Sequence, residues 1–81
     1  MEKNFIVEQD FITLGQFLKG AAIISSGGMA KPFLDSYTVL LNGEKETRHG
    51  KKLYPGDLVE IEEEGTFRIS ASRGGTEGAN L

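Results

Sequence analysis

The stretch from Ser26 to Gly43 (SGGMAKPFLDSYTVLLNG) constrains the fold of this chain more than any other. Its apolar residues first recur at the i, i+3, i+4, i+7 spacing of one buried helix face, which comprises Ala30, Phe33, Leu34 and Tyr37. The pattern then changes to a short β-branched and apolar run at 38–41. Asn42-Gly43 follows, the dipeptide preferred in a type I′ hairpin turn. A helix that leads directly into a β-hairpin predicts an α+β domain.

Two starting points are open for this helix. Ser25 or Ser26 can act as an N-cap, and Lys31 would then flank the buried face and reach solvent. Pro32 lacks an N–H group and is tolerated in the first turn of a helix but not comfortably deeper. Either the regular helix begins later than Ser26 indicates, or its first turn is distorted.

The residues before Ser26 predict a strand and a first helix. Residues 3–8 are rich in strand formers and predict a short edge strand. Thr13 has the character of an N-cap, and Gln16 stands at the capping-box spacing from it. The expected buried face consists of Leu14, Phe17, Leu18 and Ala21.

The residues after Gly43 predict further strands around a basic loop. Residues 44–47 would return along the hairpin, and the strands at 58–61 and 66–70 would complete a small antiparallel sheet. A turn with proline and glycine at its centre occupies 54–57. We expect Phe11, Phe17, Phe33 and Phe67 in the core. Because the composition turns polar from Ala71, we predict one domain at 1–70 and a disordered tail at 71–81.

Size and composition allow one small domain with a single core. The 81 residues include no cysteine, which excludes disulfides and thiolate metal sites. No apolar run approaches the roughly 18 residues of a membrane span, and the first residues lack the apolar segment of a secretion signal. We therefore expect a cytoplasmic protein that does not bind membranes.

The formal net charge of −3 hides an uneven distribution. Acidic residues gather in one late segment, as Asp57, Glu60, Glu62, Glu63 and Glu64. The segment 45–52 instead contains only one acidic residue, Glu46. Its basic residues are Lys45, Arg48, Lys51 and Lys52. Because a polyanion responds to a local patch, the net sign does not exclude a nucleic-acid partner. The acidic run is best interpreted as the solvent-exposed face of an antiparallel strand.

Several of these motifs together resemble the S4 RNA-binding domain family. The resemblance rests on Ala30-Lys31, on Val39-Leu40-Leu41-Asn42-Gly43, on the basic loop at 48–52, and on Leu53-Tyr54-Pro55-Gly56-Asp57-Leu58-Val59-Glu60-Ile61. Residues 12–19 and 26–31 also look like the small stand-alone S4 domain proteins of the YaaA type in bacteria. The resemblance covers roughly residues 12–69. It implies an S4-like (alpha-L) fold, with two short helices packed on a small antiparallel sheet.

The resemblance implies that the second helix and the basic loop form an RNA-binding face. Lys31 matches the basic position after the helix alanine, and Asn42 and Gly43 match the turn. The basic loop is matched by Arg48, Lys51 and Lys52. Arg48 is the best candidate for a bidentate phosphate contact, because a guanidinium offers a planar fork that lysine lacks.

Three further residues are candidates for RNA contact on chemical grounds. Gly27 and Gly28 would let a phosphate approach the N–H groups at the start of the second helix, although the pair also suits a tight interhelix turn. His49 is the only histidine, and it can add a hydrogen bond or a stacking face for RNA. We assign it no catalytic role.

We therefore predict a protein that binds structured RNA without catalysis and without a cofactor or metal. The expected partner is ribosomal RNA or an assembling ribosomal subunit, and the protein is expected to be a monomer. No nucleophile–base pair, metal cluster or phosphate-loop motif points to an enzyme. One alternative is a β-grasp sulfur-carrier-like protein, although Gly74-Gly75 is followed by further residues up to Leu81. A protein-interaction adaptor is another.

Overall fold

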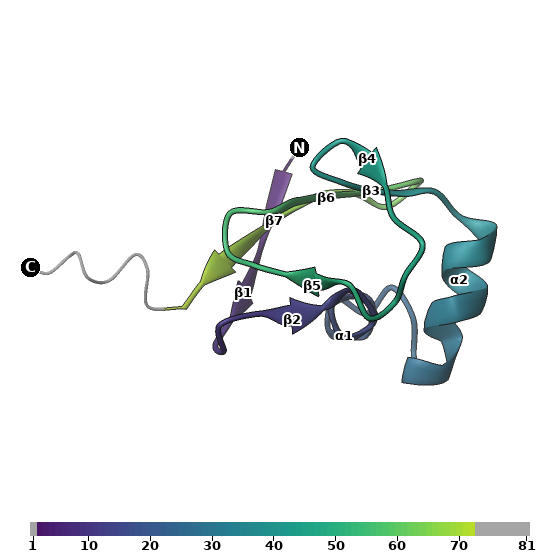
Figure 1. Cartoon of the computed structure of the whole chain (residues 1–81), viewed down its shortest axis with the longest axis horizontal. Coiled ribbons are helices and arrows are strands. Elements are labelled where there is room, and N and C mark those ends of the chain that lie inside the picture. The colour runs from purple at the N-terminus through teal and green to yellow at the C-terminus, as the bar shows by residue number, and fades with distance from the viewer. Residues whose placement is uncertain (1, 73–81) are drawn as a thin grey trace, which may run out of the picture.

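A computed structural model describes residues 2–72 and shows two helices, a 3-10 turn and seven strands (Figure 1). A five-stranded sheet has the order β1-β7-β6-β3-β4, and a separate pair joins β2 to β5. In chain order the elements are β1 (Glu2–Val7), β2 (Ile12–Thr13), α1 (Leu14–Gly20), η1 (Gly27–Met29), α2 (Ala30–Ser36), β3 (Val39–Leu41), β4 (Glu44–Lys45), β5 (Lys52–Leu53), β6 (Leu58–Ile61) and β7 (Gly65–Ala71). The α+β fold class is as predicted.

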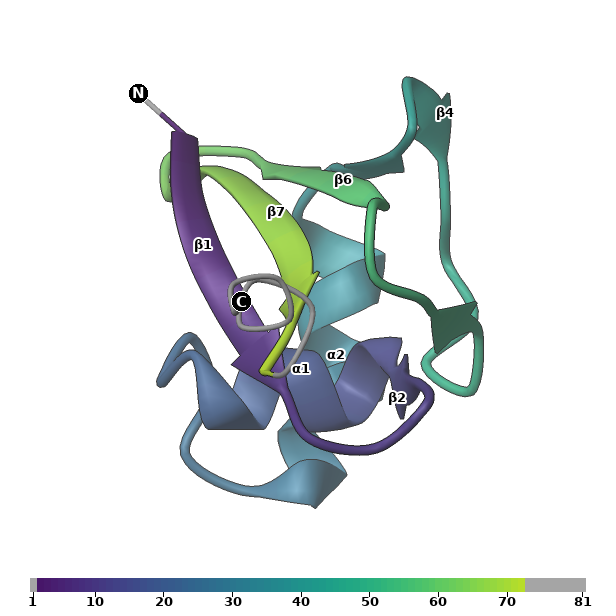
Figure 2. The ribbon, with the colours of Figure 1, turned by 90° about the vertical axis from the view of Figure 1, so that its left-hand side faces the viewer.

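The main sheet is mixed, whereas the sequence predicted an antiparallel one. β1 lies at the edge, as expected for residues 3–8, but it pairs in parallel with β7, with Glu2 opposite Thr66 and Val7 opposite Ala71 (Figure 2). The remaining pairs are antiparallel. Parallel strands need a long crossover, and here both helices and the β3–β6 segment separate β1 from β7 in the chain.

Helix α1 begins and packs as its sequence predicts. The Gln16 N–H donates to Thr13 Oγ1 at 3.2 Å, and the Thr13 N–H donates to Gln16 Oε1 at 3.0 Å, which completes the capping box. Leu14, Phe17 and Leu18 are buried on the expected face, and Ala21 is half-buried at the C-cap. Phe17 packs edge-on against Phe5 of β1 and Phe67 of β7, with ring centroids 4.9 and 5.3 Å away.

Helix α2 begins at Ala30, which resolves the two starts left open by the sequence. The 3-10 turn η1 precedes it, and the Ser26 side chain makes no capping hydrogen bond. Pro32 is therefore the third residue of α2 and lies in its first turn, where a backbone N–H has no intrahelical partner to lose. Ala30 and Leu34 are buried.

The core lies between the helices and the main sheet. Its fully buried side chains are Leu14, Phe17, Leu18, Val39, Leu53, Val59 and Ile69. Phe17 and Phe67 are buried as expected, but Phe11 and Phe33 are only half-buried. Phe33 remains packed against the core, whereas Phe11 lies beside the exposed Tyr54, with the two ring planes tilted by 49°. The prediction of Phe11 as a core residue was wrong. Phe11 directly precedes β2, a strand that the sequence did not reveal, and the pairing of β2 with β5 places the Phe11 ring beside Tyr54.

Both predicted turns are present. Asn42 and Gly43 have φ values of +52° and +88°, which fit a type I′ turn between β3 and β4. In the second turn the Asp57 N–H donates to the Tyr54 carbonyl at 3.0 Å, with Gly56 at φ +101°. The return strand ends at Lys45 rather than at residue 47. Ala71, the first residue of the expected tail, still belongs to β7, and residues 73–81 lie outside the described part of the chain.

Candidate functional site

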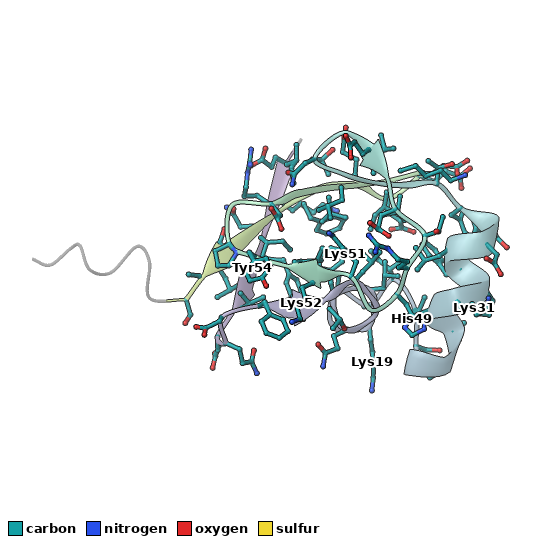
Figure 3. All side chains as sticks on the ribbon, viewed as in Figure 1. Lys19, Lys31, His49, Lys51, Lys52 and Tyr54 are labelled. Carbon is teal, nitrogen blue, oxygen red and sulfur yellow. The ribbon has the colours of Figure 1, made fainter. Side chains whose placement is uncertain are left out.

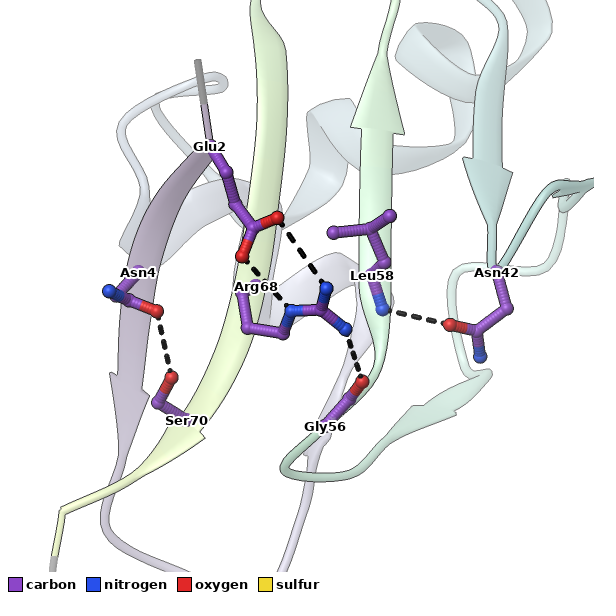
Figure 4. Close-up of polar contacts among 7 residues, drawn as sticks. All are labelled: Glu2, Asn4, Asn42, Gly56, Leu58, Arg68 and Ser70. Carbon is purple, nitrogen blue, oxygen red and sulfur yellow. Dashed lines mark hydrogen bonds and ion pairs between the residues drawn. The ribbon is translucent and has the colours of Figure 1, made fainter. Parts of the chain in front are cut away.

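The two motif turns form one hydrogen-bonded unit although they are far apart in the chain. The Asn42 Nδ2–H donates to Asp57 Oδ1 at 3.1 Å. Asn42 Oδ1 also accepts the Leu58 N–H at 2.9 Å (Figure 4). Asp57 Oδ2 in turn accepts the Tyr54 N–H at 2.8 Å. These bonds close the base of the segment 44–54, which carries the predicted basic loop.

The second turn is also fixed to the main sheet. The Gly56 N–H donates to the Ile69 carbonyl at 2.7 Å, and the Ile69 N–H donates to the Asp57 carbonyl at 2.9 Å. Arg68 on β7 donates from Nη1 to the Gly56 carbonyl at 2.9 Å and pairs through Nε with Glu2 at 3.0 Å (Figure 4). The turn that begins at Tyr54 is therefore held in place against β7.

The middle of the basic loop is docked on the start of α1. The Leu14 N–H donates to the Lys51 carbonyl, and the Gly15 N–H donates to the His49 carbonyl, each at 2.8 Å. These two donors belong to the first turn of the helix, where no intrahelical acceptor exists. A Cβ added at Gly15 would lie 3.3 Å from the His49 oxygen and 3.5 Å from Ala30 Cβ. The loop, α1 and the start of α2 thus meet at this glycine.

The short pair of β2 and β5 holds the other end of the loop. Ile12 lies opposite Leu53, and Thr13 lies opposite Lys52. The fully buried Leu53 side chain anchors β5 in the core. Because neighbouring side chains in a strand point to opposite faces, burial of Leu53 turns Lys52 outward.

These anchors create a hollow of about 510 Å³ that gathers the loop cations, and we call it the basic hollow. Its lining includes Lys45, Arg48, Lys51, Lys52, Asn42, Tyr54, Glu44, Glu46, Asp57 and Leu41. Four of the predicted contact residues are therefore brought together, namely Asn42, Arg48, Lys51 and Lys52. Lys45, which was not among the predicted contact residues, joins them from the hairpin.

Arg48 is engaged within the protein, which the sequence analysis did not anticipate. Its Nε lies 3.0 Å from Glu46 Oε2, and its Nη2 lies 3.3 Å from Oε1. The Glu46 carboxylate also accepts the N–H groups of Thr47 and Arg48, at 3.1 and 2.9 Å. Side-chain exposure is 11% for Glu46 and 71% for Arg48. The planar fork of Arg48 already faces a carboxylate, so it is not freely available for a phosphate.

The contacts between Glu46 and Arg48 shift the pKa values of both side chains. The hydrogen bond and charge of Arg48, helped by the backbone N–H donors, lower the pKa of Glu46 to about 2 from an ordinary 4.5. Glu46 in return raises the pKa of Arg48. Among the described residues, ion pairs within 4.0 Å join Arg48 to Glu46 and Arg68 to Glu2. Within that part of the chain, Lys45, Lys51 and Lys52 therefore have no carboxylate partner.

Two aromatic rings stand at the margin of the basic hollow. Phe11 and Tyr54 have ring centroids 5.8 Å apart, and Lys52 Nζ lies 4.8 Å from the Phe11 centroid. Tyr54 is 47% exposed. A flat exposed ring beside ammonium groups offers a stacking surface for an unpaired base. Phe11 could not be placed here from the sequence, because the contact depends on the pairing of β2 with β5.

The remaining predicted residues lie outside the basic hollow. Gly27 and Gly28 are exposed in η1, with no atom within 4 Å of an added Cβ. They precede α2 instead of opening it, which corrects the expected helix start. Lys31 is exposed on α2, and Figure 3 shows His49 between Lys51 and Lys31 in the view. Gly43 lies in the hairpin turn next to Asn42.

Two kinds of feature are absent from the described residues. Across residues 2–72, the structure shows no group of three or more histidine, aspartate or glutamate side chains placed to hold a metal ion. No helix in the same range is long and apolar enough to cross a membrane.

Comparisons with known proteins agree with the resemblance found in the sequence. A family model described as S4 domain matches residues 5–70, most of the chain. A protein of Bacillus subtilis (strain 168), described as a probable ribosome maturation protein RlbA, is 56% identical over 69 residues. The alignment covers 85% of this chain and 97% of that protein.

Proposed function

Because this chain belongs to the S4 domain family, we propose that it is a non-catalytic RNA-binding protein that acts in ribosome assembly. The ribosomal role is supported by the relative described as a ribosome maturation protein. RNA binding is supported by the basic hollow, where three lysines without a carboxylate partner in the described chain surround one concavity. In this role the protein would act in the cytoplasm, and we expect it to be a monomer.

The basic hollow is the observation that carries the proposal. Lysine ammonium groups neutralise phosphates without demanding one geometry, and the loop that carries them is fixed at α1, β2 and the Asn42–Asp57 bridge. A rigid loop loses little conformational freedom on binding, which favours affinity. Phosphate contacts from Lys45, Lys51 and Lys52 would position a structured RNA, and Tyr54 would stack on an unpaired base at its margin.

Lys31 and His49 extend the proposed interface toward α2. His49 is held beside Gly15, and Gly15 also approaches Ala30 at the start of α2. An RNA strand whose backbone follows the face seen in Figure 3 would pass Lys52, Lys51 and His49 before it reached Lys31. Arg48 would join this path only when it leaves Glu46.

The proposal is tested with two double variants that change the charge equally. Lys51→Ala/Lys52→Ala removes two cations from the basic hollow, and Lys3→Ala/Lys19→Ala removes two from outside it. Binding to transcripts of ribosomal RNA is measured by fluorescence anisotropy over a range of salt concentrations. We expect the hollow variant to reduce the slope of log affinity against log salt by about 1.4 to 1.8, at roughly 0.7–0.9 per phosphate contact. The control variant should change it little. Equal losses in both variants would contradict this site.

The sulfur-carrier alternative is not favoured by these findings. Membership of the S4 domain family accounts for the turn and strand motifs that the two classes share. Gly74-Gly75, on which that chemistry depends, lies outside the described residues. The measured mass of the native chain tests this alternative directly, because a carrier would end at Gly75 or carry a thiocarboxylate.

A further inference from the structure

A second hollow, of about 500 Å³, lies between the η1–α2 segment and the β6–β7 turn, and we call it the α2 groove. Its apolar lining consists of Ile23, Ile24, Met29, Pro32, Phe33 and Tyr37. Figure 1 shows α2 beside the end of the main sheet where β3 begins and β6 ends. The α2 groove and the basic hollow share no lining residue.

The α2 groove contains two of the most exposed large apolar side chains among the described residues. Met29 is 45% exposed and Tyr37 is 41% exposed, and the described part of the chain exposes only two other large apolar side chains to this degree, Ile6 and Tyr54. Tyr37 stacks on Phe33, with ring centroids 4.7 Å apart and ring planes 26° apart. Clustered exposed apolar groups with a polar rim mark interaction surfaces.

Two hydrogen bonds between Thr38 and Glu62 hold the walls of the α2 groove in place. The Thr38 N–H donates to Glu62 Oε1 at 2.8 Å, and the Glu62 N–H donates to the Thr38 carbonyl at 3.0 Å. These bonds tie the end of α2 to the β6–β7 turn. The groove is therefore preformed, and an incoming chain would not have to open it.

The rim of the α2 groove determines the charge of its occupant. Three consecutive carboxylates, from Glu62, Glu63 and Glu64, stand on one side. No cation of residues 2–72 pairs with any of them within 4.0 Å. RNA phosphates would be repelled there, whereas lysine or arginine side chains would be attracted.

We propose that the α2 groove binds a segment of a partner protein that carries a bulky apolar side chain flanked by lysine or arginine. The apolar side chain would enter between Met29 and the Phe33–Tyr37 stack, and the basic residues would face Glu63 and Glu64. Because the basic hollow proposed for RNA shares no lining residue with this groove, the protein could hold RNA and a basic protein segment together. This surface does not depend on the proposed RNA site.

The first test identifies the occupant in cells. A photo-crosslinking phenylalanine analogue replaces Tyr37 in one strain and Tyr54 in another, since both tyrosines are exposed but on different surfaces. Crosslinked sites are sequenced by mass spectrometry. We expect position 37 to crosslink to lysine- or arginine-rich protein segments with an adjacent apolar residue, and position 54 to crosslink to RNA. Crosslinks from position 37 to RNA, to a second copy of this chain or to acidic segments would overturn the proposal. A failure at position 54 alone would count against the RNA site only.

The second test measures affinity with defined probes. A labelled nine-residue peptide of lysines around a central Phe-Leu pair is titrated into isotope-labelled protein and followed by NMR. Amide shifts should be confined to the α2 groove, and a peptide with serines in place of Phe-Leu should bind at least about fivefold more weakly. Tyr37→Ser should weaken the first peptide by a similar factor. Shifts centred on the basic hollow, or equal binding of both peptides, would overturn the proposal.

Glu63→Gly separates loss of binding from loss of folding. Glu63 has a φ of +70°, a conformation that glycine adopts without strain. This variant should raise the melting temperature by a few degrees, while it weakens the peptide about twofold to fivefold through loss of one charge. Glu44→Gln, which removes an exposed carboxylate outside the α2 groove, is the control and should leave peptide affinity unchanged. Full affinity in Glu63→Gly and Glu64→Gln together would contradict the role of the rim.

Discussion

At the scale of single residues, the Glu46–Arg48 ion pair sets how much positive charge the basic hollow presents. The sequence singled out Arg48 as the best phosphate ligand, but its guanidinium donates two hydrogen bonds to Glu46. A phosphate must therefore compete with a carboxylate that four N–H groups already stabilise. The lysines that stand apart from it are the better candidates for permanent contacts.

The pH dependence of stability should reveal this pair. The folded pKa of Glu46 is about 2, below its ordinary 4.5, so its contribution is present above pH 4.5 and is lost as pH falls toward 2. Thermal unfolding of the wild type and of Glu46→Gln between pH 2 and 6 measures it, because all other carboxylates titrate in both proteins. The difference in melting temperature should shrink toward zero at the acid end. A difference that stays constant over this range would show that Glu46 does not titrate as described.

Asn42 illustrates a predicted contact residue whose side chain is used inside the protein. Its amide bridges Asp57 and Leu58 at 3.1 and 2.9 Å, and its φ is +52°. We infer that it positions the basic loop and that any contact with RNA is secondary.

Asn42→Ala should therefore lower the free energy of unfolding by about 2 kcal/mol, through lost hydrogen bonds and a strained backbone. Asn42→Gly removes the same side chain without the strain and should cost about 1 kcal/mol less. Denaturant unfolding measures both. Folded Asn42→Gly should weaken RNA binding by less than about fivefold, because α1 and β2 still hold the basic loop in place. A loss above about fivefold would instead assign Asn42 a direct contact.

At the scale of elements, the start of α1 has a second role besides folding. Its first N–H groups hold the carbonyl groups of Lys51 and His49, so the position of the basic loop depends on the geometry of this helix end. The Thr13–Gln16 capping box fixes that end. A local sequence signal therefore controls a surface far along the chain.

Thr13→Ala should test this coupling. Loss of the cap should cost about 1 kcal/mol, which corresponds to roughly 4–8 °C in melting temperature for a domain of this size. Amide hydrogen exchange at Leu14 and Gly15 should become faster, because their bonds to the loop open when the helix end frays. Thr13→Ser keeps the hydroxyl group and serves as the control. Unchanged exchange in Thr13→Ala would show that the loop is held independently of the cap.

At the scale of the whole molecule, the basic hollow and the acidic rim lie on different surfaces, although Glu44, Glu46 and Asp57 leave the hollow a formal excess of only one positive charge. The basic hollow lies on the face formed by the 44–54 segment, and the acidic rim lies at the β6–β7 turn. This separation explains how a chain with a net charge of −3 can offer a site for a polyanion. The acidic rim would also repel phosphates from the α2 groove.

Neutralising the rim should leave RNA binding almost unchanged. The triple variant Glu62→Gln/Glu63→Gln/Glu64→Gln moves the formal net charge from −3 to zero. If the local patch controls binding, the slope of log affinity against log salt should stay near −2 to −3, as expected for about three lysine–phosphate contacts. Anisotropy titrations from low to high salt measure it. An affinity that rises more than about tenfold at moderate salt would show that net charge controls binding.

The parts predicted correctly from sequence are those fixed by neighbouring residues. The Thr13 cap, the buried face of α1 and the Asn42-Gly43 turn depend on spacings of a few residues. The β2–β5 pair, the place of Phe11 and the part of Lys45 in the site depend on contacts between distant segments. Periodicity does not report such contacts, and two-residue strands are too short to show any.

The sequence by itself determined the two helices, the hairpin, the strands β1, β6 and β7, the S4-like order of motifs and the positive charge of the loop. Only the tertiary structure decided how these charges are used. It paired β1 in parallel with β7, started α2 at Ala30, placed Glu46 on Arg48 and gathered three unpaired lysines, within the described chain, around one hollow. The physical reason is that propensity and capping act over a few bonds, whereas side-chain electrostatics and burial depend on distances that the closed chain alone sets.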